Sequence, residues 1–216
     1  MDFDLPPAND PRRLAVKQWL AGHPQPTATQ LVDAGYVVPH WPEPWGLNAD
    51  PLHQIIIDDE LAKAGVSRPA NQIGIGWAGP TLLTAGTEEQ KQRYLRPLLT
   101  GQEIWCQMFS EPDAGSDLAN VATRAVRDGD EYVVNGSKIW TSGGHLSQFG
   151  ILIARTNPEV PKHEGISYFI CPTDLPGLTM TPIVDSTGSH LCSLMMCVCR
   201  LLCEWVLRAR VGVWPR

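Results

Sequence analysis

Residues 109–117, FSEPDAGSD, mark the point where the pattern of this chain changes from helical to extended. A short apolar run, residues 104–109, leads into the segment, and alternating β-branched and aromatic residues follow it. The segment is rich in small residues and turn formers, so we expect a loop between strands. Gly115 permits close approach of the backbone, while Ser110 and Ser116 can donate hydrogen bonds to carbonyl or phosphate oxygens. Successive amides in such a turn can also form an anion-binding nest.

A second polar segment, GSKIWTSGG at residues 136–144, follows within the same extended region. Trp140 and Ser142 offer a stacking plane and a hydroxyl to a heteroaromatic ring. The competing interpretation is an ordinary turn at the first segment and, at the second, a core tryptophan beside a surface serine. That interpretation is at least as good for either segment alone. Together, however, the two segments can reach the same mouth of a small barrel. Ligand sites are common there, so the pair of segments favours the interpretation as a binding site.

The N-terminal part of the chain predicts helices over residues 11–22, 27–34, 50–64, 70–85 and 87–96, with an irregular loop at 36–48. Asp50 and Pro51 supply an N-cap and a first-turn proline. Thr87 and Gln90 form a capping-box pattern. We expect the last helix to stop before Pro97, because proline disfavours the helical conformation of the residue before it.

From Glu103 onward the sequence predicts short strands over residues 104–109, 121–126, 132–135, 137–141, 149–156, 166–172 and 178–182. Asp128-Gly129 and Asn135-Gly136 are expected as tight turns between them. Such closely spaced strands indicate a small β-barrel or sandwich. The predicted fold class is therefore α+β, with an all-α domain at residues 1–102 and a β domain at 103–190. Beyond His190 the turn pattern fails, so we expect residues 191–216 to be an aberrant tail that forms no domain.

Composition restricts the class of function. The chain has 17 basic and 23 acidic residues and no basic block, which makes nucleic acid and anionic membranes poor partners. No apolar run reaches the roughly 20 residues of a membrane helix, and the N-terminus lacks signal-peptide features, so we expect a cytoplasmic protein. The six cysteines and six histidines lack the spacing of a disulfide framework or a metal site, and no metal is expected.

The two polar segments, in this order and at this spacing, resemble the flavin-binding middle domain of the acyl-CoA dehydrogenases. In the helical part, GIGWAGPTLL at 74–83, GTEEQK at 86–91 and YLRPLLTG at 94–101 resemble the N-terminal domain of the same family. The resemblance runs from residue 31 to residue 190. It implies an N-terminal helical domain followed by a β-barrel, with the family's C-terminal four-helix domain absent from this sequence.

The cofactor that the resemblance implies is FAD. Carried over position by position, the residues that contact it are Gln107, Phe109, Ser110, Gly115, Ser116, Trp140 and Ser142. The first three would lie along the isoalloxazine ring, with Ser110 donating to its pyrimidine side. Gly115 and Ser116 would face the flavin diphosphate or the pantetheine arm of the substrate. Trp140 would cover the far face of the ring, and Ser142 would place its hydroxyl near N5.

Three positions depart from the family pattern. The family often has glycine at the position of Asp113 and Thr-Asn at the positions of Ser142 and Gly143. Serine keeps the hydroxyl of threonine, so we expect the flavin contact to survive.

The reaction implied by the resemblance is α,β-desaturation of an acyl-CoA thioester, with hydride transfer to FAD and electrons passed to an electron-transfer flavoprotein. The catalytic glutamate of the family belongs to the C-terminal domain, so no catalytic residue is assigned here and the isolated chain is expected to be weak or inactive. Glu204 receives no role. We expect the carboxylates of Asp58, Asp59, Glu60 and Glu111 to be helix-surface or loop charges.

Two other functions stay open. The chain can be a non-catalytic partner subunit of a hetero-oligomeric acyl-CoA dehydrogenase, or a related flavoenzyme such as an acyl-CoA oxidase. Full-length relatives form homo- or hetero-oligomers. Fatty, branched and steroid side-chain thioesters are all compatible with the sequence.

Overall fold

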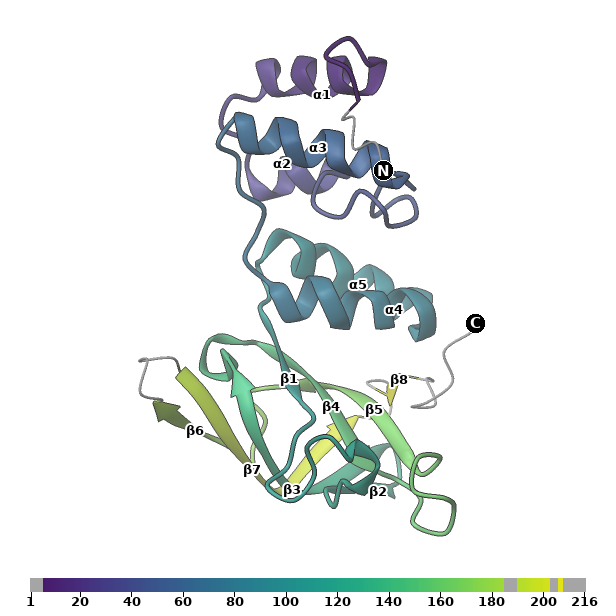
Figure 1. Cartoon of the computed structure of the whole chain (residues 1–216). Helices are drawn as coiled ribbons and strands as arrows, with labels where there is room; N and C mark the ends of the chain where they lie inside the picture. The colour runs from purple at the N-terminus through teal and green to yellow at the C-terminus, as the bar shows by residue number, and fades with distance from the viewer. Residues whose placement is uncertain (1–5, 185–189, 203–205, 208–216) are drawn as a thin grey trace. The chain divides into compact units, whose positions relative to one another are not determined.

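The structure is a computed structural model that describes residues 6–184, 190–202 and 206–207 (Figure 1). The chain forms two compact units. The first contains residues 1–71 and 94–102, and the second contains residues 72–93 and 103–216. The helical segment 72–93 thus belongs to the same unit as the sheet. The domain boundary between residues 102 and 103 stays a prediction.

The first unit contains α1 (Pro11–Gly22), α2 (Ala28–Asp33), α3 (Pro51–Lys63) and the end of α5 (Glu88–Thr100). Side chains cap each of the first three helices, and the cap at Asp50 was predicted from the sequence. Asp10 accepts from the Arg12 amide, Thr27 and Gln30 form a capping box, and Asp50 accepts from the His53 amide. The predicted helices at 11–22, 27–34 and 50–64 are therefore confirmed.

A buried ion-pair cluster lies between α1 and α3. The guanidinium of Arg13, which is 3% exposed, contacts the carboxylates of Asp59 and Glu60. Glu60 is itself only 4% exposed, so its prediction as a surface charge is wrong. The helical spacing turns Glu60 inward with Ile56 and Ile57, and the arginine makes its burial tolerable.

Two predictions about the next helices need correction. The segment expected as one helix over 70–85 contains a π-helix at Gly74–Ala78 before α4 (Gly79–Ala85). Helix α5 does not stop before Pro97 but continues to Thr100. Proline costs a helix one hydrogen bond, yet Leu98 and Leu99 just beyond it are fully buried. Burial of this last turn offsets that cost.

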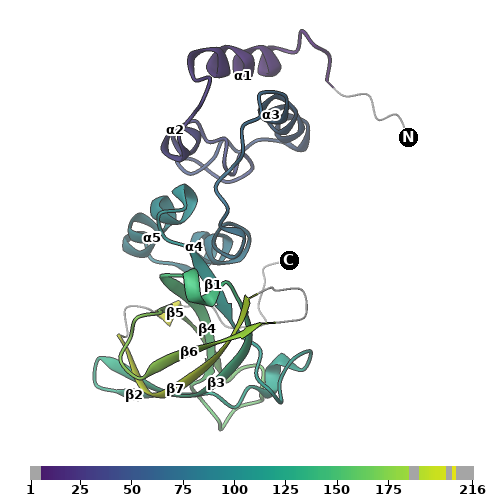
Figure 2. The same ribbon diagram turned by 90° about the vertical axis from the view of Figure 1, so that its left-hand side faces the viewer.

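The second unit is built on a curved mixed sheet (Figure 2). Its strands are β1 (Trp105–Met108), β2 (Arg124–Asp128), β3 (Glu131–Ser142), β4 (Phe149–Arg155), β5 (Ile166–Pro172), β6 (Leu178–Val184), β7 (His190–Leu202) and β8 (Val206–Leu207). The order is β6-β7-β3-β2-β4-β5-β8, and β1 pairs in parallel with β4. Met108, Val134, Leu152 and Phe169 pack in the core of this unit. The predicted α+β fold class is confirmed.

One predicted turn is confirmed and one is wrong. Gly129, with φ at 62°, lies in the turn that joins β2 to β3. Asn135 and Gly136 instead lie inside β3, which runs without a break through both segments predicted as separate strands. A Cβ at Gly136 would come within 2.3 Å of the Thr123 hydroxyl. The glycine is therefore needed for close packing of β3 against Thr123, and the sequence signal for a turn was misleading.

The sheet extends past residue 190, into the segment that we expected to lie outside a domain. Strand β7 pairs antiparallel with both β3 and β6. Backbone hydrogen bonds to two neighbouring strands need no turn residues and no alternating pattern, so this strand could not be predicted from the local sequence. Residues 203–205 and 208–216, including Glu204, lie outside the described residues. No helix in the described ranges is both long enough and apolar enough to cross a membrane.

Candidate functional site

The two polar segments singled out in the sequence lie side by side. The amide of Ile139 on β3 donates to the carbonyl oxygen of Ser110, over 2.9 Å. Ser110 lies two residues beyond the end of β1 and is half-buried. Trp140, the next residue after Ile139, is 58% exposed. The structure thus brings the Ser110 and Trp140 segments to one place on the unit. Whether these residues contact a flavin stays a prediction.

Trp140 has an unusual backbone conformation. Its φ is 62°, which is a genuine outlier for a bulky side chain. The register of β3 against β7 shifts between Lys138 and Thr141, and both of these residues are fully buried. Such a bulge re-aims side chains, and here it leaves Trp140 and Ser142 exposed. Local strain of this kind is characteristic of binding and catalytic sites.

Gly115 and Ser116 follow a tight turn after β1. Glu111 and Ala114 exchange two backbone hydrogen bonds, of 2.9 and 3.1 Å, which close the turn. Gly115 and Ser116 are exposed just beyond it. A Cβ at Gly115 would meet nothing within 4 Å, so the space above this backbone is open to a bound molecule.

The remaining two predicted residues are Gln107, within β1, and Phe109, the first residue after it. Gln107 is half-buried and pairs with Ile151 of β4. The ring of Phe109 packs edge-on against Tyr168, with 5.7 Å between the ring centroids. Burial raises the pKa of the Tyr168 phenol, which therefore stays protonated at neutral pH. Its contact with the buried Tyr168 fixes the Phe109 ring, and the next residue, Ser110, is half-buried.

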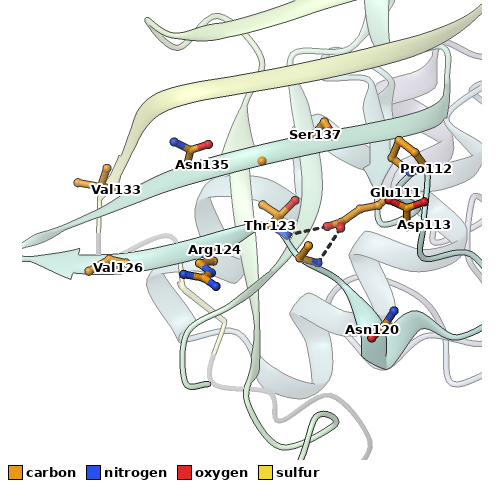
Figure 3. Close-up of a pocket in the computed structure, with 12 residues that line it drawn as sticks. Glu111, Pro112, Asp113, Asn120, Thr123, Arg124, Val126, Val133, Asn135 and Ser137 are labelled. Carbon is orange, nitrogen blue, oxygen red and sulfur yellow. Dashed lines mark hydrogen bonds between the residues drawn. The ribbon is translucent and has the colours of Figure 1, made fainter. Parts of the chain in front are cut away.

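Beneath the two segments lies a buried ion pair that the sequence did not reveal. Lys138 is 0% exposed and Glu111 is 7% exposed, so the prediction of Glu111 as a loop charge is wrong. The Lys138 Nζ donates to Glu111 Oε1 over 2.8 Å and to the Phe109 carbonyl over 3.0 Å. The Glu111 carboxylate also accepts from the amides of Ala122, at 2.7 Å, and Thr123, at 3.0 Å (Figure 3).

Both charges of this pair are affected by burial. Burial alone raises the pKa of the Glu111 carboxyl, but hydrogen bonds from Lys138, Thr123 and Ala122 outweigh it and hold the pKa below its ordinary value. Burial lowers the pKa of the Lys138 ammonium, and Glu111 offsets this only in part. The hint in the sequence was Lys138 itself, since the strand alternation around it predicts an inward-facing position.

An open cavity of about 750 Å³ has the Glu111 member of this pair in its wall (Figure 3). Its walls come from the turn after β1 and from β2 and β3, and its charged lining groups are Glu111, Asp113 and Arg124. None of the seven residues predicted to contact flavin lines this cavity. Across the described part of the chain, no three His, Cys, Asp or Glu side chains are grouped to hold a metal ion.

Comparison with known proteins identifies both halves of the chain. The family model of the acyl-CoA dehydrogenase N-terminal domain matches residues 11–102, and that of the middle domain matches residues 106–200. Acyl-CoA dehydrogenase FadE34 of Mycobacterium tuberculosis is 47% identical over 161 residues, which cover 74% of this chain and 22% of that protein.

Solved structures give the same result. The ChsE4-ChsE5 complex from Mycobacterium tuberculosis superposes with a TM-score of 0.77 and 32% identity, over 98% of this chain and 58% of that chain. A glutaryl-CoA dehydrogenase from Mycobacterium smegmatis in complex with FADH2 superposes with a TM-score of 0.62 and 26% identity, over 90% of this chain and 53% of that one. The chain therefore spans less than two thirds of the length of each of these relatives.

Proposed function

Because this chain belongs to the acyl-CoA dehydrogenase family, we propose that it binds FAD and forms part of an enzyme that desaturates an acyl-CoA thioester at its α and β carbons. The observation that supports this best is the exposed Trp140, held in a strained conformation beside Ser110. When bound, FAD supplies the hydride acceptor of the reaction.

The residues present fit a flavin. An exposed aromatic plane, adjacent hydroxyls and an uncovered glycine backbone are the groups that a planar, anionic cofactor needs. Trp140 would cover one face of the ring, and Ser110 and Ser142 would donate hydrogen bonds to its polar edge. Gly115 and Ser116 would lie against the diphosphate or the pantetheine arm of the acyl-CoA.

The chemistry also needs a base to remove the α-proton of the substrate. In the resemblance that base is a glutamate of the C-terminal domain, for which these 216 residues hold no counterpart. We therefore assign no catalytic residue. We propose that these 216 residues by themselves bind FAD weakly, desaturate little or no acyl-CoA, and deliver no electrons to an electron-transfer flavoprotein.

The test is a titration of the purified chain with FAD, followed by anaerobic addition of straight, branched and steroid side-chain acyl-CoAs. We expect saturable flavin binding and no bleaching of the flavin. The Trp140→Ala variant is expected to unfold at nearly the same temperature, because the side chain is largely exposed, but to bind FAD about 3- to 10-fold more weakly through loss of stacking.

Three outcomes would count against the proposal. Absence of any saturable flavin binding removes the FAD assignment. Rapid bleaching by an acyl-CoA shows that the missing base is not needed. Oxygen consumption without an added electron acceptor indicates an oxidase of the same fold instead.

A second candidate function is a partner subunit that completes its site with another chain. It is favoured by the similarity to the ChsE4-ChsE5 complex, which contains two different chains. Co-expression with a full-length member of the family tests it. A stable hetero-oligomer on size-exclusion chromatography supports the partner role, and a chain that elutes alone contradicts it.

A further inference from the structure

Three hydrogen bonds connect the loop after β1 to strand β3. In the loop they involve the consecutive residues 109–111, and in β3 the consecutive residues 138 and 139. The Lys138 ammonium binds the Phe109 carbonyl and the Glu111 carboxylate, and the Ile139 amide binds the Ser110 carbonyl. The position of Ser110 is therefore fixed by a hydrogen bond to its own carbonyl oxygen and by one to each of its neighbours, Phe109 and Glu111. Trp140 follows Ile139 directly, so the same contacts also fix the position of the Trp140 backbone.

The carboxylate extends the same set of contacts further along the loop. Glu111 accepts from the amides of Ala122 and Thr123, which lead into β2. Its backbone closes the turn with Ala114, from which Gly115 and Ser116 emerge. One buried side-chain pair therefore lies at the base of both polar segments.

Burying two charges is expensive, and a pair of apolar side chains of similar volume is often as stable. An apolar pair makes no directional bonds, however, whereas a fully satisfied polar network specifies one geometry. Both hydrogen bonds of the Lys138 ammonium go to the loop that carries Ser110. The pair is therefore better explained by the geometry it specifies than by the stability it adds.

We propose that Lys138 and Glu111 are positioning residues that hold the Ser110 loop in register with Trp140 and thereby set the affinity for flavin. This rests on the proposed function for the identity of the ligand, but the positioning itself is a property of the chain alone. It can be measured with no flavin present.

The experiment compares the wild-type chain with Lys138→Met, which keeps most of the side-chain volume and loses every donor. Hydrogen exchange is followed at the amides of Ile139 and Ala114, with amides of β4 as an internal reference for global opening. We expect exchange at Ile139 and Ala114 to rise about tenfold relative to β4, as expected for loss of a charge-assisted hydrogen bond. FAD affinity, measured by quenching of flavin fluorescence, is expected to fall by a similar factor, with a shift in the visible circular dichroism of the bound flavin.

Thr141→Val is the matched control. The Thr141 hydroxyl is buried on the same strand and has no hydrogen-bond partner among the described residues. Its removal is expected to change neither the exchange rates nor the flavin affinity. Glu111→Gln is a second variant, for use if Lys138→Met does not fold, and is expected to act in the same direction with a smaller effect.

The outcomes separate this inference from the proposed function. Unchanged exchange at Ile139 and Ala114 in Lys138→Met and Glu111→Gln overturns the positioning role, whatever happens to flavin. If wild type binds no flavin but the variants still raise exchange at these two amides, the positioning stands and the flavin assignment fails. Faster exchange with unchanged flavin affinity and spectrum would show a purely structural pair and would also overturn the inference.

Discussion

At Glu111 the chain holds a carboxylate almost out of solvent, with three donors directed at it from Lys138, Ala122 and Thr123. Residue type alone suggests a surface loop charge, because most glutamates are exposed. The difference comes from the partners, which lie far away in the sequence. These hydrogen bonds stabilise the fold fully only while the Glu111 carboxyl is ionised, because all three donors favour the charged form.

This predicts an acid-sensitive contribution to stability. The folded-state pKa of Glu111 lies below the ordinary value of 4.5, so its contribution is complete above that pH and is lost as the pH falls through the folded-state pKa. Lys138 is the charged side chain in contact with the carboxylate, and Asp113 and Arg124 are the other charged residues that line the adjoining cavity. We expect Glu111→Gln to be less stable than wild type by about 1–3 kcal/mol at pH 7.

Thermal unfolding between pH 3 and pH 7 checks this. The difference between wild type and Glu111→Gln is expected to shrink steadily as the pH falls below 4.5. A constant difference over this range would mean that the carboxylate does not ionise differently on folding.

Strand β3 has two irregularities in its pairing with β7. One lies where the sheet packs against Thr123, and the other lies at the candidate site. The register of β3 against β7 shifts first between Val134 and Gly136 and again between Lys138 and Thr141. The first allows close contact with Thr123, and the second turns Trp140 outward. A regular strand would satisfy neither requirement.

Two glycines, Gly136 within β3 and Gly115 in the loop after β1, are expected to respond differently to the same substitution. Gly136→Ala would force a Cβ to within 2.3 Å of the Thr123 hydroxyl and 2.7 Å of its Cα, and we expect a loss of about 1–3 kcal/mol. Gly115→Ala meets nothing within 4 Å, so its unfolding should match wild type. Because Gly115 is expected to face the flavin diphosphate, that variant should instead bind FAD more weakly.

Denaturant unfolding and flavin titration of both variants check this pair. A stable Gly136→Ala protein would show that β3 can move away from Thr123. Wild-type flavin affinity in Gly115→Ala would place the diphosphate elsewhere.

The sheet as a whole depends on β7, which comes late in the chain. Strand β7 lies between β3 and β6, so it contributes hydrogen bonds on both sides. Removing it would leave β3, which carries Trp140, as an unpaired edge. Exposed strand edges invite aggregation.

A chain ending at residue 189 is therefore expected to aggregate or to lose the cooperative unfolding of its second unit. A chain ending at residue 207 retains every described strand and serves as the control. Size-exclusion chromatography and thermal unfolding compare the two. A monomeric, cooperatively unfolding 1–189 chain would show that β7 is dispensable.

The amino-acid sequence was enough to predict the capped helices, the change from helix to strand near residue 104, the family, and the two polar segments. These depend on short-range signals such as Asp50-Pro51 or on residue runs that can be recognised without knowing their neighbours. Four features became evident only in the folded chain: α5 passes through Pro97, Asn135-Gly136 lies within a strand, β7 completes the sheet, and Lys138 is paired with Glu111. Each of these is settled by contacts between residues distant in the chain, since burial and long-range hydrogen bonds override local propensity.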